Sequence, residues 1–139
     1  MYLIDANIFL ELELGQKKSL ECQELLNMVK DGKIEAIISD ITIDSIVIVM
    51  ENFKKTWREI AIFLTSLLMY KGLRIHSLNM ADKIAAAELM GKYSLDFEDS
   101  AVLQILVSRS HLKGLISYDR DFDNIPGIKR LEPSFFVGD

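Results

Sequence analysis

The chain has 139 residues, of which half are hydrophobic, 27% are charged and only two are proline. This is the length and composition of an ordered globular protein, which excludes a disordered or fibrous chain and predicts a single domain over residues 1–139. The formal net charge of −5 argues against a broad basic surface that grips duplex DNA, although a basic rim around a pocket of acids would still accommodate a nucleic acid.

The first half of the chain reads as strands that alternate with helices. Residues 2–4 form a first strand, and residues 19–31 form a helix for which Ser19 is the expected cap and Gly32 lies just beyond the end. The isoleucine-rich segment 34–39 reads as a second strand that is buried on both faces. The β-branched residues of segment 42–55 would suit a strand, but the length and continuing period of this segment favour a helix.

The second half continues the alternation. A helix over residues 56–71 is predicted to bury one apolar face, formed by Trp57, Ile60, Ala61, Leu64, Leu67 and Leu68. The remaining elements are a strand at 73–78, a helix at 80–93 with Asn79 as its cap, a helix at 97–112, and strands at 114–119 and 128–133. This order predicts an α/β fold with three layers, α/β/α, around a central parallel sheet.

The apolar content exceeds what the core of a small protein requires. Mean hydropathy is +0.18, yet the longest apolar segment, residues 60–70, contains Thr65 and Ser66 and is too short to cross a bilayer. We therefore expect a homodimer without membrane contact. The strand-like start, followed at once by acids, does not resemble a signal peptide and predicts a cytoplasmic protein. The one cysteine, Cys22, falls on the apolar face of its helix, which favours packing over reactivity.

Acids recur where the predicted strands end. Asp5, Asp40 and Asp119 each follow a strand, and in a parallel sheet the carboxyl ends of the strands share one edge. Asp96 and Asp99 stand at the start of the helix that leads into the late strand. Each acid also has a local interpretation: Asp5 with Asn7 suits a side-chain turn, and Asp96 suits a helix N-cap. Separate turns do not explain why the acids gather at one edge.

Clustered carboxylates need a positive partner, and these residues indicate a hard cation. The chain has one cysteine and only two histidines, His76 and His111, which lack the spacing of a metal pair. Carboxylate oxygens therefore point to Mg²⁺ or Mn²⁺, and such ions commonly serve hydrolysis at phosphorus. No glycine-rich phosphate loop is present in the sequence. An aspartyl-phosphate enzyme would also need a lysine after a late strand, which is not found at a convincing position.

Three blocks carry a resemblance to a known family: LIDANIFL near the start, LDFEDSAVLQ in the second half, and LISYDRDFDNIPGIKRLEP near the end. In order and spacing they resemble the signature blocks of PIN-domain ribonucleases, especially the toxin nucleases of VapBC-type systems. The resemblance implies a parallel sheet with flanking helices and a metal-dependent endonuclease that acts on single-stranded RNA. It also implies a small antitoxin that binds near the acidic cleft.

The resemblance assigns roles to particular residues. It implies that Asp5, Asp99 and Asp119 are catalytic and bind Mg²⁺ or Mn²⁺, and that the site is supported by Asn7, Asp44, Asp96, Ser117 and Asp121. Ser45 stands where the family usually carries a glutamate. Asp44 is one residue away, about 100° around a helix, so Asp40 or Asp44 would have to substitute. The alternative is a PIN-like module that binds RNA or protein without efficient cleavage.

Basic residues near the acids are the candidates for RNA binding. Arg120 directly follows Asp119, and Lys54, Lys55 and Arg58 lie along a helical segment. For the two lysines, a solvated helix face is an equally good interpretation. We expect a single strand, because its exposed backbone can enter a narrow acidic cleft, although the sequence shows no evident aromatic platform for stacking bases.

Overall fold

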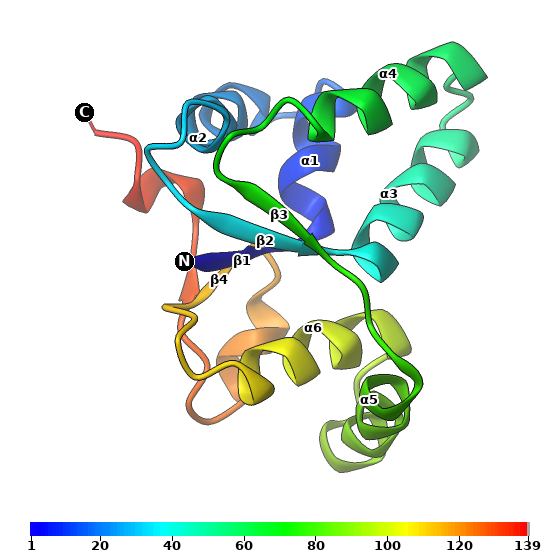
Figure 1. The fold of residues 1–139 in the computed structure, drawn as a ribbon, viewed down its shortest axis with the longest axis vertical. Coiled ribbons are helices and arrows are strands. Elements are labelled where there is room, and N and C mark those ends of the chain that lie inside the picture. Colours follow the sequence, from blue (N-terminus) through cyan, green and yellow to red (C-terminus); the bar gives the residue numbers. More distant parts are fainter. Residues whose placement is uncertain (139) are drawn as a thin grey trace.

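The molecule is built on a parallel sheet. Its structure is a computed structural model that describes residues 1–138. Within these residues, parallel strands form one five-stranded sheet in the order β3-β2-β1-β4-β5 (Figure 1). The strands are β1 (Tyr2–Ile4), β2 (Ala36–Ser39), β3 (Leu73–His76), β4 (Leu115–Ile116) and β5 (Arg130–Leu131). Because β1 lies at the centre, the residue that follows it faces the middle of the sheet edge.

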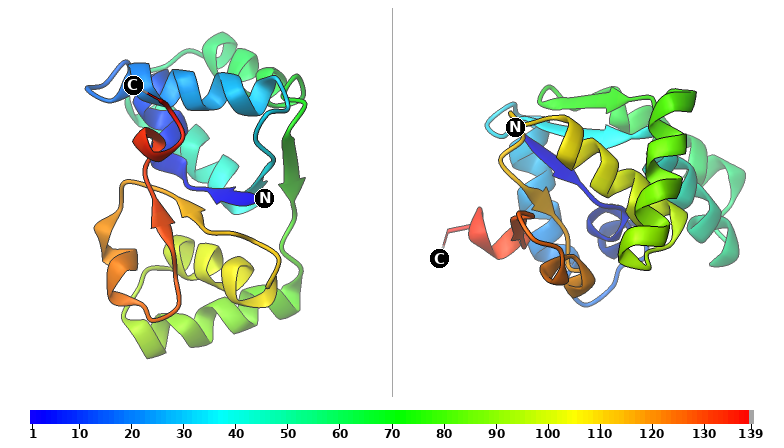
Figure 2. Two further views of the ribbon diagram at one scale, coloured as in Figure 1. Left: turned by 90° about the vertical axis from the view of Figure 1, so that its left-hand side faces the viewer. Right: turned by 90° about the horizontal axis from the view of Figure 1, so that it is seen from below.

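Helices cover both faces of this sheet. They are α1 (Ala6–Glu13), α2 (Ser19–Lys30), α3 (Asp40–Asn52), α4 (Trp57–Leu67), α5 (Met80–Tyr93) and α6 (Phe97–Ser108), with short 3-10 helices η1 (Arg120–Asn124) and η2 (Pro133–Phe135). The first four helices lie on one side of the sheet, and α5, α6 and η1 lie on the other (Figures 1 and 2). The predicted three-layer α/β/α fold is confirmed.

The strands separate two hydrophobic cores. Ile4 and Ile38 join the core beneath α1 to α4, whereas Leu3 and Ile37 face α5 and α6. This alternation follows from the two-residue period of a strand. All four residues of β2 are buried, as the isoleucine-rich segment predicted. The buried strands therefore fix which way the residues at their carboxyl ends point.

Side-chain caps define where most helices begin. Ser39, Thr56, Asn79 and Asp96 each accept a hydrogen bond from a backbone N–H in the first turn of the helix that follows. The prediction of Ser19 as a cap is wrong: α2 begins at Ser19 itself, and the residue before it makes no side-chain cap bond. Serine also has a usable propensity inside a helix, so its presence alone does not place the boundary.

The predicted buried face of α4 is correct only in part. Leu67 is buried and Ile60 packs against the core as predicted, but Trp57 is 70% exposed and Leu68 is 77% exposed, and the buried Phe63 was not predicted. The Phe63 ring packs edge-on against Phe9 of α1, with 5.9 Å between the ring centroids, and this contact sets the rotation of the helix. Apolar residues occupy several sides of α4, because Ala61, Ile62, Phe63 and Leu64 are consecutive, so periodicity did not single out the stripe that meets the core.

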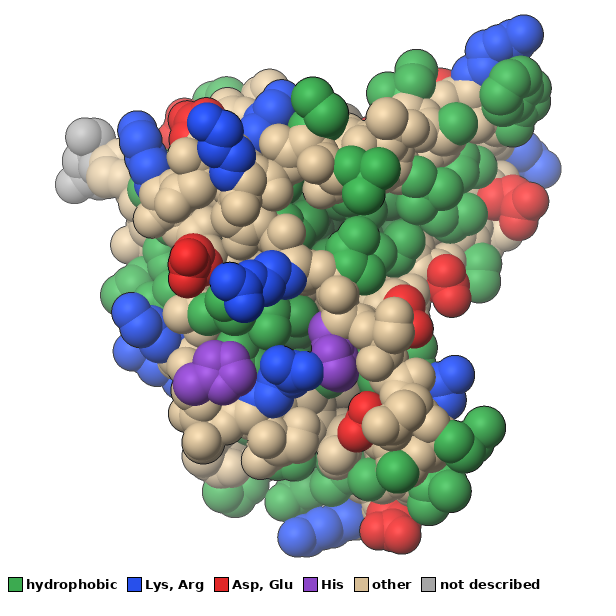
Figure 3. Space-filling model, viewed as in Figure 1, with side chains coloured by type: hydrophobic (Ala, Val, Ile, Leu, Met, Phe, Trp, Pro, Cys, Tyr) green, Lys and Arg blue, Asp and Glu red, His purple; other side chains and the backbone are tan. Residues whose placement is uncertain are grey.

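Exposed apolar side chains remain on α3 and α4. They are prominent on the face shown in Figure 3, and they include Ile48, Trp57, Ile62, Leu64, Leu68 and Met69. Single exposed apolar residues are ordinary, but a contiguous group marks an interaction surface. Among residues 1–138, every helix is too short or too polar to cross a bilayer.

A close backbone approach before β3 requires glycine. A Cβ at Gly72 would lie 2.2 Å from the Ile34 carbonyl oxygen, whereas Gly91, inside α5, has open space around it. We expect Gly72→Ala to lower the free energy of unfolding by about 1–3 kcal/mol or more, because backbone must move. Gly91→Ala is the control and should raise it by about 0.5–1 kcal/mol. Urea unfolding of both variants tests this, and equal midpoints would contradict it.

Candidate functional site

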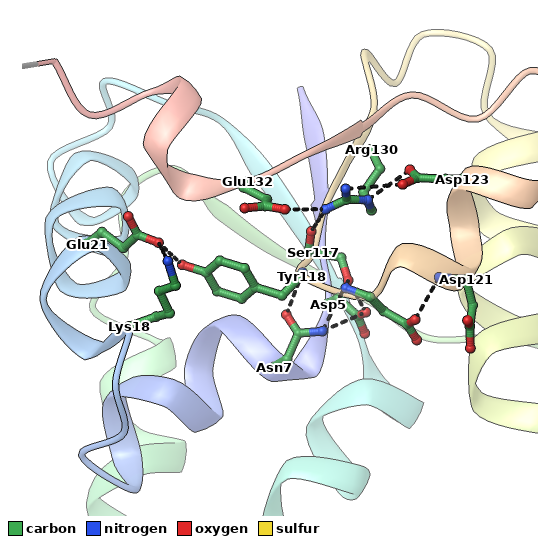
Figure 4. A network of polar contacts seen from close by, with 11 residues as sticks. Asp5, Asn7, Lys18, Glu21, Ser117, Tyr118, Asp121, Asp123, Arg130 and Glu132 are labelled. Carbon is green, nitrogen blue, oxygen red and sulfur yellow. Dashed lines mark hydrogen bonds and ion pairs between the residues drawn. The ribbon is translucent and has the colours of Figure 1, made fainter.

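Asp5 is a buried carboxylate at the carboxyl end of the central strand. It directly follows β1, is only 3% exposed, and caps α1 by accepting a hydrogen bond from the Ala6 N–H at 2.8 Å. Its Oδ2 atom accepts hydrogen bonds from Ser117 Oγ at 2.6 Å and from Asn7 Nδ2 at 3.3 Å (Figure 4). The local interpretation of Asp5 as a cap is therefore correct, and a contact with the distant Ser117 exists as well.

Ser117 joins the ends of β1 and β4. Its fully buried hydroxyl donates to Asp5, and it accepts from Asn7 Nδ2 at 3.1 Å and from the Asp119 N–H at 3.0 Å. Asn7 in turn accepts from the Tyr118 N–H at 3.1 Å (Figure 4). These bonds restrict the Asp5 and Ser117 side chains and fix the position of the Asp5 carboxylate relative to the Asp119 backbone.

The loop after β4 carries Asp119 and Asp121. Asp119 caps η1 by accepting from the Asp121 N–H at 2.9 Å, and Phe122 is fully buried beneath the loop. Arg130 of β5 stabilises this loop. Its guanidinium donates to the Ser117 carbonyl at 3.0 Å and to Asp123 at 2.9 Å (Figure 4). Asp121 itself is exposed.

The start of α6 brings three more acids to this edge. Asp96 caps the helix by accepting from the Asp99 N–H at 2.8 Å, while Glu98 and Asp99 are partly buried. The predicted N-cap at Asp96 is thus correct. The N-terminal end of a helix carries a partial positive charge, which makes it a favourable place for carboxylates.

The charges of these acids act on one another. Burial is the main cause that raises the pKa of Asp5, and Asp119 and Asp96 raise it further. Burial raises the pKa of Asp99 to about 7, with added repulsion from Asp96, Asp5, Asp119 and Glu98 in that order. Hydrogen bonds give the geometry: Ser117 donates to Asp5 and accepts from the Asp119 N–H, and Glu98 at the start of α6 accepts from Ser45 of α3, so these segments adjoin at the carboxyl edge of the sheet.

The chemistry of these donors fits a hard divalent cation. Their oxygens are the ligands that Mg²⁺ and Mn²⁺ prefer. Burial first, and then neighbouring negative charge, raises the pKa of Asp5 and Asp99, and a bound cation would compensate that charge. Within residues 1–138, no three acid, histidine or cysteine side chains already lie close enough to hold one ion. Asp5, Asp99 and Asp119 would therefore have to draw closer around a shared ion.

The structure separates Asp40 and Asp44 from this group. Asp40 Oδ1 accepts from the Leu78 N–H at 3.3 Å and so binds the connection between β3 and α5. Asp44 is exposed and borders a hollow between α3 and α4 together with Ile48 and Leu64. Ser45 points about 100° away from Asp44 around α3, and its hydroxyl donates to Glu98 Oε2 at 2.6 Å.

Glu98 is the acid that the sequence reasoning missed. Burial raises its pKa, the hydrogen bond from Ser45 lowers it, and the charges of Asp5 and Asp96 raise it again. The available signal was its place beside Asp99 in the first turn of α6. Neighbouring helix positions point about 100° apart, so the sequence alone does not show that both side chains face the same site.

The four basic residues divide into two groups. Arg120 is exposed and directly follows Asp119. Lys54, Lys55 and Arg58 lie at the connection between α3 and α4, so the 13 residues of α3, about 20 Å, separate them from the start of that helix. There Lys55 pairs with a neighbouring glutamate at 3.6 Å, and the Arg58 guanidinium lies 4.7 Å from the centre of the Trp57 ring.

Comparison with known proteins places this arrangement in context. Curated protein sequences give no match. The structure resembles a toxin-antitoxin complex from Klebsiella pneumoniae with 20% identity and a TM-score of 0.68, over 96% of this chain and 98% of that chain. It resembles VapC20 of Mycobacterium tuberculosis, a toxin that cleaves the sarcin-ricin loop, with 13% identity and a TM-score of 0.75, over 93% and 97%.

A third structure agrees with these two. The chain resembles DNA-bound VapBC from Salmonella typhimurium with 17% identity and a TM-score of 0.66, over 95% of this chain and 97% of that chain. At such identities the likeness is one of fold. The sequence itself matches the PIN domain over residues 2–128. This match extends over most of the chain, and the chain therefore belongs to the PIN domain family.

Proposed function

We propose that this protein is a metal-dependent endoribonuclease that hydrolyses phosphodiester bonds in single-stranded RNA, as the toxin of a toxin-antitoxin pair. The observation that supports this proposal is the Ser117 hydroxyl, which donates to the Asp5 carboxylate and accepts from the Asp119 backbone N–H at the carboxyl edge of the sheet. Membership of the PIN domain family and the likeness to VapC structures support it. We also propose that residues 1–139 act as one domain, in the cytoplasm.

Each acid has a defined task in this proposal. Asp5, Asp99 and Asp119 would hold Mg²⁺ or Mn²⁺, with Asp96 or Asp121 beside them. When bound, the cation would polarise a phosphoryl oxygen and lower the pKa of the attacking water. Ser117 and Asn7 keep Asp5 oriented toward the edge of the sheet through their hydrogen bonds.

The substrate backbone would approach over the rim of the acidic edge. Arg120 is exposed beside Asp119, so its guanidinium is placed to contact a phosphate next to the scissile one. Lys54, Lys55 and Arg58 could contact the same RNA only if the strand ran along α3 for about the length of that helix, roughly 20 Å. Their role therefore depends on a longer substrate.

The second candidate is a module that binds RNA or a protein with little or no cleavage. Ser45 favours it, because a short hydroxyl stands at the position where the resemblance implies a glutamate. Asp44 faces the hollow between α3 and α4 and does not fill that place. Binding without cleavage would distinguish this module from the nuclease.

We expect the nuclease to require its acids. Wild-type protein with Mg²⁺ or Mn²⁺ should cleave a labelled single-stranded RNA. Asp5→Asn or Asp119→Asn should reduce the rate by about 100-fold or more, since a lost ligand removes several kcal/mol of transition-state stabilisation. Asp31→Asn, an exposed acid at the end of α2, is the matched control and should cleave like wild type.

The same assay separates the two candidates. Equal cleavage by wild type and both site variants would indicate a contaminating nuclease and contradict the assignment. Retained RNA binding by wild type, with no cleavage at any metal concentration, would favour the binding module. Gel-shift measurements on the same RNA supply the binding readout.

The exposed apolar surface on α3 and α4 supports a protein partner. We propose a small antitoxin and a homodimer of this 15.8 kDa chain.

Light scattering should give twice the mass of one chain for the wild-type protein. Leu68→Asp, at a residue 77% exposed beside α4, should give monomers, whereas Leu20→Asp, at a residue 69% exposed on α2, should stay dimeric. A monomeric wild type would make the dimer prediction wrong, and a dimeric Leu68→Asp would place its interface elsewhere.

The pKa of Asp99 predicts how stability depends on pH without metal. Burial raises the pKa of Asp99 to about 7 in the folded protein, which keeps the proton up to about that pH, whereas the unfolded chain releases it near the ordinary aspartate pKa of 3.8. Folded protein therefore binds more protons in this window, and its Tm in EDTA should fall as the pH rises from 5 to 8. Each ~1 kcal/mol lost corresponds to about 4 °C.

Asp99→Asn and added metal provide the controls. Asp99→Asn should have a flatter Tm profile between pH 5 and 8, because asparagine has no proton to lose. Mn²⁺ should raise the wild-type Tm more at pH 8 than at pH 6, since a cation binds the ionised carboxylates. Thermal unfolding followed by circular dichroism measures both effects, and equal pH slopes for wild type and Asp99→Asn would contradict the assignment.

A further inference from the structure

We propose that Glu98 is a further ligand of the divalent cation and that Ser45 is a positioning residue that holds it, an inference that rests on the metal site of the proposed function. The central observation is the 2.6 Å hydrogen bond from Ser45 Oγ of α3 to Glu98 Oε2 of α6. It brings a carboxylate from one helix to the side chain of another, 53 residues away in the sequence.

The positions of the two helices direct this carboxylate toward the acids. α3 begins directly after β2 and α6 begins at Asp96, so both helices start near the acidic edge. Ser45 lies in the second turn of α3, and Glu98 lies in the first turn of α6, next to Asp99. Glu98 directly precedes the proposed ligand Asp99, and its charge contributes to the raised pKa of that residue.

Glu98 also lacks a basic partner in the described part of the chain. The ion pairs among residues 1–138 involve Lys18, Lys55 and Arg130, none of which pairs with Glu98, Asp5 or Asp99. A partly buried carboxylate among other carboxylates costs free energy unless a cation compensates it. Only Oε2 accepts the hydrogen bond from Ser45, so Oε1 can serve as a ligand.

The contact also accounts for the residue at position 45. A serine there is too short to reach the edge of the sheet, but its hydroxyl can orient a longer acid from the opposite helix. Glu98 thereby supplies a carboxylate next to the place where the resemblance implies a glutamate side chain. Hydrogen bonds of this kind, from a neighbour to a ligand, fix ligand orientation and strengthen metal binding.

Mn²⁺ affinity, measured by titration calorimetry and by electron paramagnetic resonance of free Mn²⁺, tests both roles without reference to activity. Glu98→Gln should weaken binding about tenfold or more, and Ser45→Ala should weaken it less. Ser45→Thr keeps a hydroxyl and should restore the affinity. Glu88→Gln, an exposed glutamate on α5, is the matched charge control and should bind like wild type.

The double variant isolates the positioning role. If Ser45 acts through Glu98, Ser45→Ala should have no further effect on Mn²⁺ affinity in the Glu98→Gln background. Wild-type affinity in Glu98→Gln would overturn the ligand role, and an undiminished Ser45→Ala effect in that background would overturn the positioning role. Circular dichroism melting of each variant verifies that it is folded.

Asp5→Asn distinguishes a failure of the Glu98 role from a failure of the whole metal site. If wild type binds Mn²⁺, Asp5→Asn does not and Glu98→Gln binds like wild type, this inference fails while the proposed metal site stands. If wild type binds no Mn²⁺, the metal site and the role of Glu98 fail together.

Discussion

The hydrogen bond from Ser117 to Asp5 is the contact on which the candidate site depends. It joins the carboxyl ends of the two neighbouring strands β1 and β4, and the same serine oxygen accepts from the backbone that carries Asp119. Burying a carboxylate costs free energy unless it is hydrogen-bonded, and here Ser117, Asn7 and the Ala6 N–H all donate to Asp5. The strands thus set the position of the first acid, and Ser117 relates it to the second.

The arrangement of the chain makes this meeting a consequence of topology. Because the sheet is parallel, the residue that follows each strand lies at the same edge. The helices carry the chain back to the opposite edge, so the acids that follow the strands lie at one edge. α6 adds carboxylates from the N-terminal side of a helix, where backbone N–H groups favour them. Residues 112 positions apart, such as Asp5 and Ser117, therefore contact each other without a long loop.

Sequence reasoning predicted what short-range patterns determine and missed what packing determines. The alternation of strands and helices from residue 19 onward, the Asn79 cap and the Asp96 cap follow from local chemistry, and the structure has them, but helix α1 was not predicted. The buried face of α4 includes Phe63, which packs against Phe9 of α1, and the sequence pattern of α4 alone does not reveal this contact between helices. Likewise Glu98 is defined by a hydrogen bond from Ser45 on another helix, so its neighbours along the chain could not identify it.

The brace formed by Arg130 couples the acidic loop to the edge of the sheet. Its guanidinium connects the Ser117 carbonyl, Asp123 and Glu132, and β5, the strand that carries it, has only two residues. An edge strand of two residues forms few backbone hydrogen bonds, so the charged side chain of Arg130 provides much of the attachment between the loop and the sheet. The charged contacts of Arg130 are 2.8 to 3.2 Å long and its side chain is only 11% exposed, so they are much shorter than the Debye length of about 8 Å at physiological ionic strength and are screened little. The geometry around Asp119 is consequently little affected by the salt content of its surroundings.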